Sequence, residues 1–200
     1  MGRLYGNETQ MTEKNSPIRN ICVYCGSSPG RSPSYVEAAN TLGTAMAEAG
    51  IGLVYGGGDI GLMGAVAKAC VQAGGNVKGI IPEFLIGVEQ EYDIANVDGV
   101  DMTVVPDMHT RKRIMFEEAD AFIAMPGGIG TLEEIVEIMT WAQLARHTKP
   151  MALLNVDDFW SPMVGLVRHM ADEGFLHNPE RTDLLLDGDP RGLLDKILAR

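Results

Sequence analysis

Two glycine-rich segments carry the residues whose types and spacing could do chemistry in this 200-residue chain. Residues 56–64 read GGGDIGLMG and residues 126–134 read PGGIGTLEE, and each segment follows an apolar run and precedes a helical pattern. Glycines at such turns let the backbone approach a ligand closely, and the helix N-terminus that follows offers unpaired N–H groups to an anion. The first loop alone is equally consistent with a tight turn. Two such loops together favour a site for a phosphorylated ligand.

A run of three cations, Arg111, Lys112 and Arg113, lies at the start of another helical pattern. Cations at a helix N-terminus are unfavourable with the helix dipole, so we expect an anion to compensate them. Arg111 shares one helical face with Met115, whereas Lys112 and Arg113 are rotated away from it and are equally consistent with a solvated surface.

Thr131 and Glu134 have the spacing of a capping box, in which both side chains satisfy backbone N–H groups at a helix start. A carboxylate near a helix N-terminus is also expected to stay ionised, which would suit a group that orients water or stabilises a cation. The structural and the chemical interpretation of Glu134 are compatible, and the spacing alone does not choose between them.

Composition narrows the classes of function. The chain has 16 Lys and Arg against 27 Asp and Glu, a formal net charge of −11, which disfavours a nucleic-acid partner and requires any anionic ligand to be met locally. No apolar run is long enough to span a bilayer, so no membrane partner is expected. Cys22, Cys25 and Cys70 are too few for a disulfide scaffold and indicate a cytoplasmic protein. The C-x-x-C spacing of the first two falls in an apolar strand, where we expect buried thiols on opposite faces.

Short apolar runs alternate with helical patterns from residue 18 to the end. This alternation predicts a doubly wound α/β fold with a mainly parallel sheet and helices on both faces, in one domain over residues 18–200 after a flexible tail over residues 1–17. Residues 82–100 form a long connection. The predicted strands are 21–25, 51–55, 76–81, 103–105, 121–125, 151–155 and 184–186, and the predicted helices are 34–49, 62–73, 109–119, 131–144, 158–173 and a last one from 191.

The two glycine-rich segments and the cationic run at 111–113 together resemble the Lonely Guy (LOG) family of cytokinin-activating phosphoribohydrolases. Its P-G-G-x-G-T-x-x-E motif is matched by residues 126–134, its R-K pair by Arg111 and Lys112, and its G-G-G-x-x-G-L-M-G loop by residues 56–64. The resemblance covers residues 20–160. Similar proteins have been called lysine decarboxylase-like, but the sequence shows no site typical of a pyridoxal enzyme.

The resemblance implies a Rossmann-like fold and hydrolysis of the N-glycosidic bond of AMP or of N6-modified (cytokinin) nucleoside 5′-monophosphates, which gives the free base and ribose 5-phosphate. It implies no cofactor, no metal and a homodimer or higher homo-oligomer. The implied catalytic residues are Arg111 and Glu134. The implied substrate-binding residues are Glu89, Arg111, Lys112, Gly127, Gly128, Ile129, Gly130, Thr131, Leu132, Glu133, Gly57, Gly58 and Thr140. Glu89 lies in a segment, residues 87–101, that departs from the family pattern.

Two other classes of protein fit part of the pattern. Molybdenum-cofactor carrier proteins resemble this fold and share a P-G-G-x-G-T loop, but they hold their ligand without hydrolysing it. The presence of both Arg111 and Glu134 beside the loop favours the enzyme. A dinucleotide-dependent oxidoreductase would use Gly56, Gly58 and Gly61 with Glu83 as the acidic partner, but that fingerprint normally lies at the first strand-helix turn and here follows the second strand.

Overall fold

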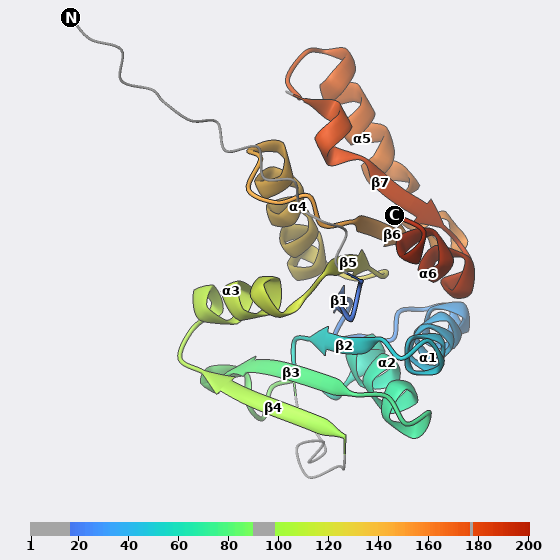
Figure 1. Cartoon of the computed structure of the whole chain (residues 1–200), viewed down its shortest axis with the longest axis vertical. Coiled ribbons are helices and arrows are strands. Elements are labelled where there is room, and N and C mark those ends of the chain that lie inside the picture. The colour runs from blue at the N-terminus through green and yellow to red at the C-terminus, as the bar shows by residue number, and fades with distance from the viewer. Residues whose placement is uncertain (1–16, 90–98, 177) are drawn as a thin grey trace, which may run out of the picture.

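A seven-stranded, entirely parallel sheet forms the centre of the protein, with the strand order β4-β3-β2-β1-β5-β6-β7 (Figure 1). The computed structural model describes residues 17–89, 99–176 and 178–200. The predicted flexible tail therefore lies outside the described residues except for Pro17. The strands are β1 Asn20–Tyr24, β2 Gly52–Tyr55, β3 Val77–Pro82, β4 Val100–Val105, β5 Ala121–Ala124, β6 Met151–Leu154 and β7 Leu184–Asp187.

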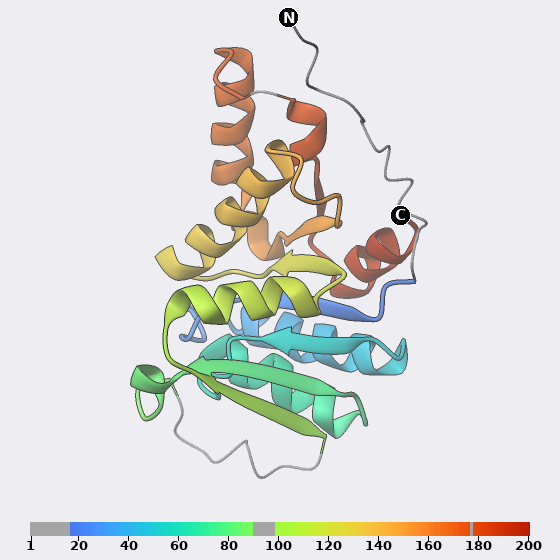
Figure 2. The ribbon, with the colours of Figure 1, turned by 60° about the vertical axis from the view of Figure 1, so that its left-hand side comes forward.

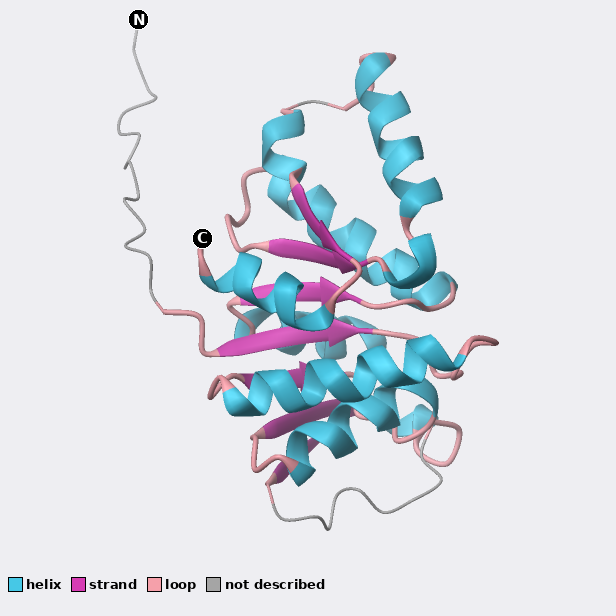
Figure 3. Ribbon diagram, turned by 90° about the vertical axis from the view of Figure 1, so that its right-hand side faces the viewer, coloured by secondary structure: helices cyan, strands magenta, loops and turns pink. Residues whose placement is uncertain are grey.

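Helices cover both faces of this sheet, which confirms the predicted doubly wound α/β architecture (Figure 3). Helices α1, α2 and α6 pack on one face, and α3, α4 and α5 lie on the other. In the described part of the chain, no helix is both long and apolar enough to cross a membrane. The helices are α1 Pro33–Glu48, α2 Gly61–Gln72, α3 Met108–Glu118, α4 Ile129–Gln143, α5 Ser161–Asp172 and α6 Pro190–Leu198.

The central strands β1, β2 and β5 are apolar at nearly every position because both sheet faces are covered. In β1, Ile21 and Val23 point into the core under α1, α2 and α6, whereas Cys22 and Tyr24 point into the core under α3 and α4. The predicted opposite placement of Cys22 and Cys25 is confirmed, and both thiols are free and buried.

The direction of winding changes between β1 and β5, which are neighbours in the sheet but far apart in the sequence. The chain leaves β1 toward α1 on one face and leaves β5 toward α4 on the other, so the two loops separate at the carboxyl ends of these strands (Figure 2). The N–H of Gly26 donates to the carbonyl of Pro126 at 3.1 Å and ties the two loops together at their base. Ligands of open parallel sheets bind at such a switch point.

Candidate active site

A cavity of about 490 Å³ opens at this switch point. It lies between the end of β1, the loop after β2, the turn after β3 and the N-terminal parts of α3 and α4. Its lining residues are Val23, Tyr24, Cys25, Gly26, Ser27, Gly56, Met63, Phe84, Leu85, Glu89, Met108, Arg111, Met115, Gly128, Ile129, Gly130, Thr131, Glu133 and Glu134.

The N-terminus of α4 forms one wall and is open to a ligand. The first backbone hydrogen bond of the helix runs from the N–H of Leu132 to the carbonyl of Gly128 at 3.1 Å, so the N–H groups of residues 129–131 have no partner within the helix. A Cβ at Gly128 or Gly130 would meet no protein atom within 4 Å. These two glycines are therefore not required by packing, and they leave free space beside the N–H groups.

The capping box predicted from Thr131 and Glu134 does not form. Helix α4 begins two residues before Thr131, its N-cap is Gly128, and no side chain caps it. Thr131 is buried and packs against Gly127, where a Cβ would collide with the threonine side chain. Glu134 lies in the second turn of the helix and so is not used as a cap.

Arg111 is a buried cation with unused hydrogen-bonding capacity. Its residue is only 6% exposed, its Nη1 lies 3.8 Å from the sulfur of Met108, and its Nε has no partner. Among the residues that the structure describes, no carboxylate forms an ion pair with it. A buried charge of this kind is costly unless a counter-charge is supplied, which suits a site for an anionic ligand.

Gly56 makes room for this arginine. A Cβ at Gly56 would overlap Nη2 of the guanidinium, so the glycine after β2 is needed for the placement of Arg111 rather than for its own backbone conformation. Helix α3 begins beside this point and is capped by Asp107, whose carboxylate accepts a hydrogen bond from the N–H of Thr110 at 2.8 Å. The β2 loop and the first turn of α3 therefore fix Arg111 together.

Glu134 faces the cavity with a strongly perturbed carboxyl group. Burial raises its pKa to about 7, and the nearby Arg111 guanidinium opposes part of that rise, whereas Glu133 and Glu89 add to it. Loss of hydration thus works against the ionised form that a position near the helix N-terminus favours. Near neutral pH the group exists in both protonation states.

Glu89 supplies a second carboxyl group to the cavity. Its Oε2 is buried and has no hydrogen-bond partner among the described residues, while its backbone carbonyl accepts from the N–H of Asp59 at 2.9 Å. The backbone is thus fixed to the glycine loop after β2, and the side chain keeps an unsatisfied acceptor at the cavity.

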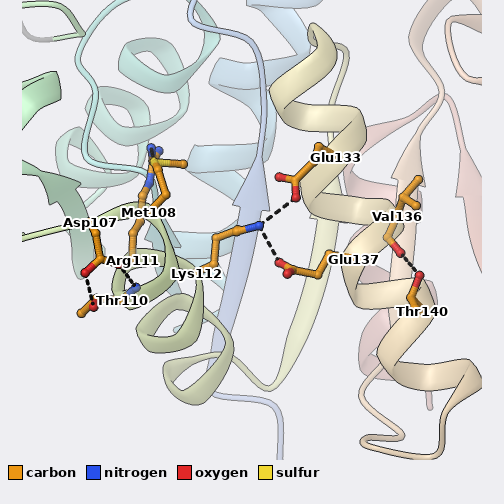
Figure 4. Close-up of polar contacts among 9 residues, drawn as sticks. All are labelled: Asp107, Met108, Thr110, Arg111, Lys112, Glu133, Val136, Glu137 and Thr140. Carbon is orange, nitrogen blue, oxygen red and sulfur yellow. Dashed lines mark hydrogen bonds and ion pairs between the residues drawn. The ribbon is translucent and has the colours of Figure 1, made fainter.

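Several residues predicted for the site lie outside the cavity lining. Gly57 has a φ of +80° and packs near Ile81, and a Cβ at Gly58 would press on Met63. Gly127 and the half-buried Leu132 pack within the protein, and Thr140 lies on the exposed side of α4 with its hydroxyl donating to the carbonyl of Val136 (Figure 4). Lys112 is also absent from the lining, and its ammonium forms ion pairs with Glu133 and Glu137 instead of standing alone on the surface.

The apolar wall of the cavity was not predicted from the sequence. It is formed by Met63, Met108 and Met115 together with Phe84 and Leu85. Methionines in helical patterns are indistinguishable from core residues in a sequence, which is why they gave no signal. The segment after β1, residues 25–27, could have been found from its position at the carboxyl end of a predicted strand.

Fold and site together define a Rossmann-like α/β protein whose cavity lies at the switch point of a parallel sheet. Solved structures agree with the fold. The molybdenum cofactor carrier protein from Chlamydomonas reinhardtii is 22% identical with a TM-score of 0.65 and covers 91% of this chain and 99% of that chain. A molybdenum cofactor binding protein from Rippkaea orientalis is 23% identical with a TM-score of 0.63, over 90% and 96%. At these identities the likeness concerns the fold.

Sequence comparisons give the family. A family model described as "Possible lysine decarboxylase" matches residues 63–197. Cytokinin riboside 5′-monophosphate phosphoribohydrolase LOG7 of Arabidopsis thaliana is 48% identical over 83% of this chain and 75% of its own length. The enzyme of the same description from Rhodococcoides fascians is 40% identical over 90% and 89%. The chain belongs to the family of cytokinin riboside 5′-monophosphate phosphoribohydrolases.

Proposed function

We propose that this protein hydrolyses the N-glycosidic bond of AMP or of an N6-modified, cytokinin-type nucleoside 5′-monophosphate and releases the free base and ribose 5-phosphate. The observation that carries the proposal is the meeting of three features in one cavity: the buried Arg111, which has no ion-pair partner among the described residues, the carboxyl group of Glu134 and the open N-terminus of α4. Family membership gives the same reaction independently of the geometry.

The phosphate is held at the N-terminus of α4 in this proposal. The N–H groups of Ile129, Gly130 and Thr131 and the helix dipole favour an anion there, and Arg111 adds a full charge. The open space beside Gly128 and Gly130 lets the phosphate oxygens approach the backbone. Glu89 then lies where its free acceptor can receive a hydrogen bond from a ribose hydroxyl, and the methionine and Phe84 wall receives the flat base.

Glu134 acts on the reacting carbon. Cleavage of the bond between C1′ and the base nitrogen passes through an oxocarbenium-like sugar, and its bonding electrons leave with the base. An ionised Glu134 stabilises the positive sugar and accepts a proton from the water whose oxygen bonds to C1′. One proton then passes to the departing base, which gives the neutral free base and restores the ionised Glu134. Arg111 neutralises the phosphate and favours the ionised form of Glu134, whose pKa of about 7 places this form within reach at neutral pH.

We also propose that the protein acts as a homodimer or higher homo-oligomer. Helix α5 has no buried residue, although Leu166, Met170 and the following Phe175 are exposed apolar side chains. Exposed apolar residues that gather along one helix indicate a surface for another protein, and the usual partner is a second copy. We assign the protein to the cytoplasm, where its three free, buried thiols would stay reduced.

The description of the family model points to another reaction. A pyridoxal-dependent lysine decarboxylase needs a lysine amine that forms a Schiff base with its cofactor. No lysine is among the residues that line the described cavity. The residues present do not fit that chemistry.

A carrier that holds a phosphorylated ligand unchanged would need the open helix N-terminus but would have no use for Glu134 beside it.

A substrate panel tests the proposal. The purified protein is incubated with nucleoside 5′-monophosphates and with the matching nucleosides, and free base is measured by chromatography. We expect base from AMP or its N6-modified relatives and none from the nucleosides. Arg111→Ala and Glu134→Gln should each lower the rate by about 10²-fold to 10³-fold. Binding of the nucleotides without release of base would support a carrier, and stabilisation by NAD alone would support an oxidoreductase.

A further inference from the structure

Lys112 bridges two helices at the edge of the candidate active site. Its Nζ lies 2.7 Å from Oε1 of Glu133 and 3.1 Å from Oε2 of Glu137, and its side chain is only 15% exposed (Figure 4). Lys112 lies on α3, and both carboxylates lie on α4, one helical turn apart. The single ammonium of Lys112 therefore links α3 to α4.

This bridge is adjacent in sequence to both proposed catalytic residues. Lys112 follows Arg111 on α3, and Glu133 precedes Glu134 on α4. A shift of α3 against α4 would change the Lys112 contacts and the separation of Arg111 from Glu134 together. Farther from the cavity, Phe116 of α3 meets the ring of Trp141 of α4 at a centroid distance of 4.8 Å. The ion pairs thus fix the end of the helix pair that carries the chemistry.

The charges of the bridge also argue against a direct contact with substrate. Two carboxylates face one ammonium, so the cluster of Lys112, Glu133 and Glu137 carries a net negative charge. A phosphate dianion gains little from a cation that is already paired in this way. Arg111, in contrast, has no carboxylate partner among the residues described.

We propose that Lys112 is a positioning residue that holds α3 against α4 through Glu133 and Glu137, and so sets the approach of Arg111 to Glu134 for catalysis. This inference rests on the proposed hydrolysis and departs from the expectation that Lys112 contacts the substrate. Placement of catalytic groups to well within 1 Å is worth about 10²-fold in rate, so a bridge of modest strength can matter for turnover.

The same cluster acts on the charge of Glu134. Lys112 lowers the pKa of Glu134 and Glu133 raises it, although burial and Arg111 have larger effects. Loss of the lysine should therefore move this pKa above 7, and loss of the Glu133 charge should move it below. The ionisable groups that face Glu134 from the surrounding elements are Arg111 and Lys112 of α3, Glu133 of α4, Glu89 of the turn after β3, and Cys22, Tyr24 and Cys25 of β1 and its end.

Arg113 gives a matched control for the variant Lys112→Met. It is the next residue and also a cation, but it pairs with Glu117 at 3.1 Å within α3, and its side chain is 60% exposed. Lys112→Met should lower kcat about tenfold to hundredfold with little change in KM, whereas Arg113→Met should leave both near the wild-type values. Lys112→Arg, which can still reach both carboxylates, should recover most of kcat. Thermal unfolding of all variants should stay cooperative.

The pH dependence separates positioning from a purely structural effect. If ionised Glu134 is required, the acid limb of kcat/KM should move to higher pH in Lys112→Met and to lower pH in Glu133→Gln. The pKa of Glu134, followed by NMR in the substrate-free protein, should likewise rise in Lys112→Met and fall in Glu133→Gln. This measurement does not require the protein to be active. A wild-type protein that releases no base refutes the proposed function, while this titration still tests the bridge.

Two results would overturn the inference. A kcat of Lys112→Met equal to that of Arg113→Met would show that the bridge does not position the catalytic pair. A rise in KM for AMP with unchanged kcat in Lys112→Met, absent in Arg113→Met, would identify Lys112 as a substrate contact.

Discussion

Glu134 illustrates how a residue can serve chemistry at the expense of stability. Burial beside Glu133 and Glu89 disfavours its charge, and the buried Arg111 only partly offsets this. The folded protein therefore holds a proton on Glu134 at a pH at which the unfolded chain has lost it. Such a pKa difference between the two states makes the free energy of unfolding depend on pH.

The sign of this dependence can be tested with Glu134→Gln. Because the folded-state pKa of about 7 lies above the ordinary value of 4.5, stability should fall as the pH rises from about 4.5 through 7. The glutamine is neutral at every pH, so the variant should be more stable than wild type at pH 8, on the order of 2 kcal/mol, and similar to it at pH 4. Denaturant unfolding at both pH values measures this. Equal stability at pH 8 would contradict the perturbed pKa.

A substitution at Gly130 should affect phosphate binding and folding stability in opposite ways. Its Cβ position is empty and it lies in the first turn of α4, so Gly130→Ala should stabilise the protein by about 0.5 kcal/mol. The added methyl group should nevertheless raise KM for AMP, because it occupies the proposed phosphate space. Gly127→Ala is the contrasting variant, since its Cβ would strike Thr131 and destabilise the fold. An alanine at 130 with unchanged KM would contradict phosphate binding there.

The main residues of the candidate site could be recognised in the sequence, but the contacts that position them could not. Arg111, Glu134 and the second glycine loop could be singled out by type and spacing. The need for Gly56 could not, because it comes from an arginine distant in the sequence. The capping-box interpretation was wrong since α4 begins at Ile129, before Thr131, and a spacing rule cannot identify the first helical residue.

At the scale of elements, every predicted strand and helix exists, and most boundaries differ by one or two residues. The larger differences are β4, which starts at Val100 rather than 103, and α5, which starts at Ser161 after a short turn. Among the described strands β4 pairs with β3 alone, and its mixture of exposed and half-buried residues gave a weaker apolar signal than the central strands. Edge position, which follows from the assembled sheet, cannot be read from a local pattern.

The packing of α1 on α2 makes a prediction at this scale. A Cβ at Gly43 would lie 2.9 Å from the N–H nitrogen of Cys70, 3.1 Å from the Cβ of Ala69, and closer still to the carbonyl oxygen of Val66. Gly43→Ala should therefore destabilise the fold by about 1–3 kcal/mol despite the better helix propensity of alanine. Gly165→Ala in α5 is the control, because its Cβ meets nothing. Thermal melts should show the two variants shifting in opposite directions, with kcat unchanged in both.

At the scale of the whole molecule, the two helical layers have different roles. The layer of α1, α2 and α6 packs through small residues on one sheet face and gives the site a fixed base. The layer of α3, α4 and α5 carries Arg111 and Glu134 and ends in the unburied α5 (Figure 2). The layer that carries the chemistry is thus also the one that contains α5, a helix with no buried residue and with exposed apolar side chains.

The proposed dimer should depend on that surface. Leu166 is 53% exposed on α5, and a charge there would be buried on association without a partner, which is strongly unfavourable. We expect light scattering to give at least twice the 21.6 kDa mass of the chain for wild type and the monomer mass for Leu166→Glu. Leu198→Glu, at a 42% exposed leucine of α6 on the other layer, should leave the mass unchanged. A Leu166→Glu protein that still associates would show that the interface lies elsewhere. A monomeric wild-type protein would refute the proposed homo-oligomer.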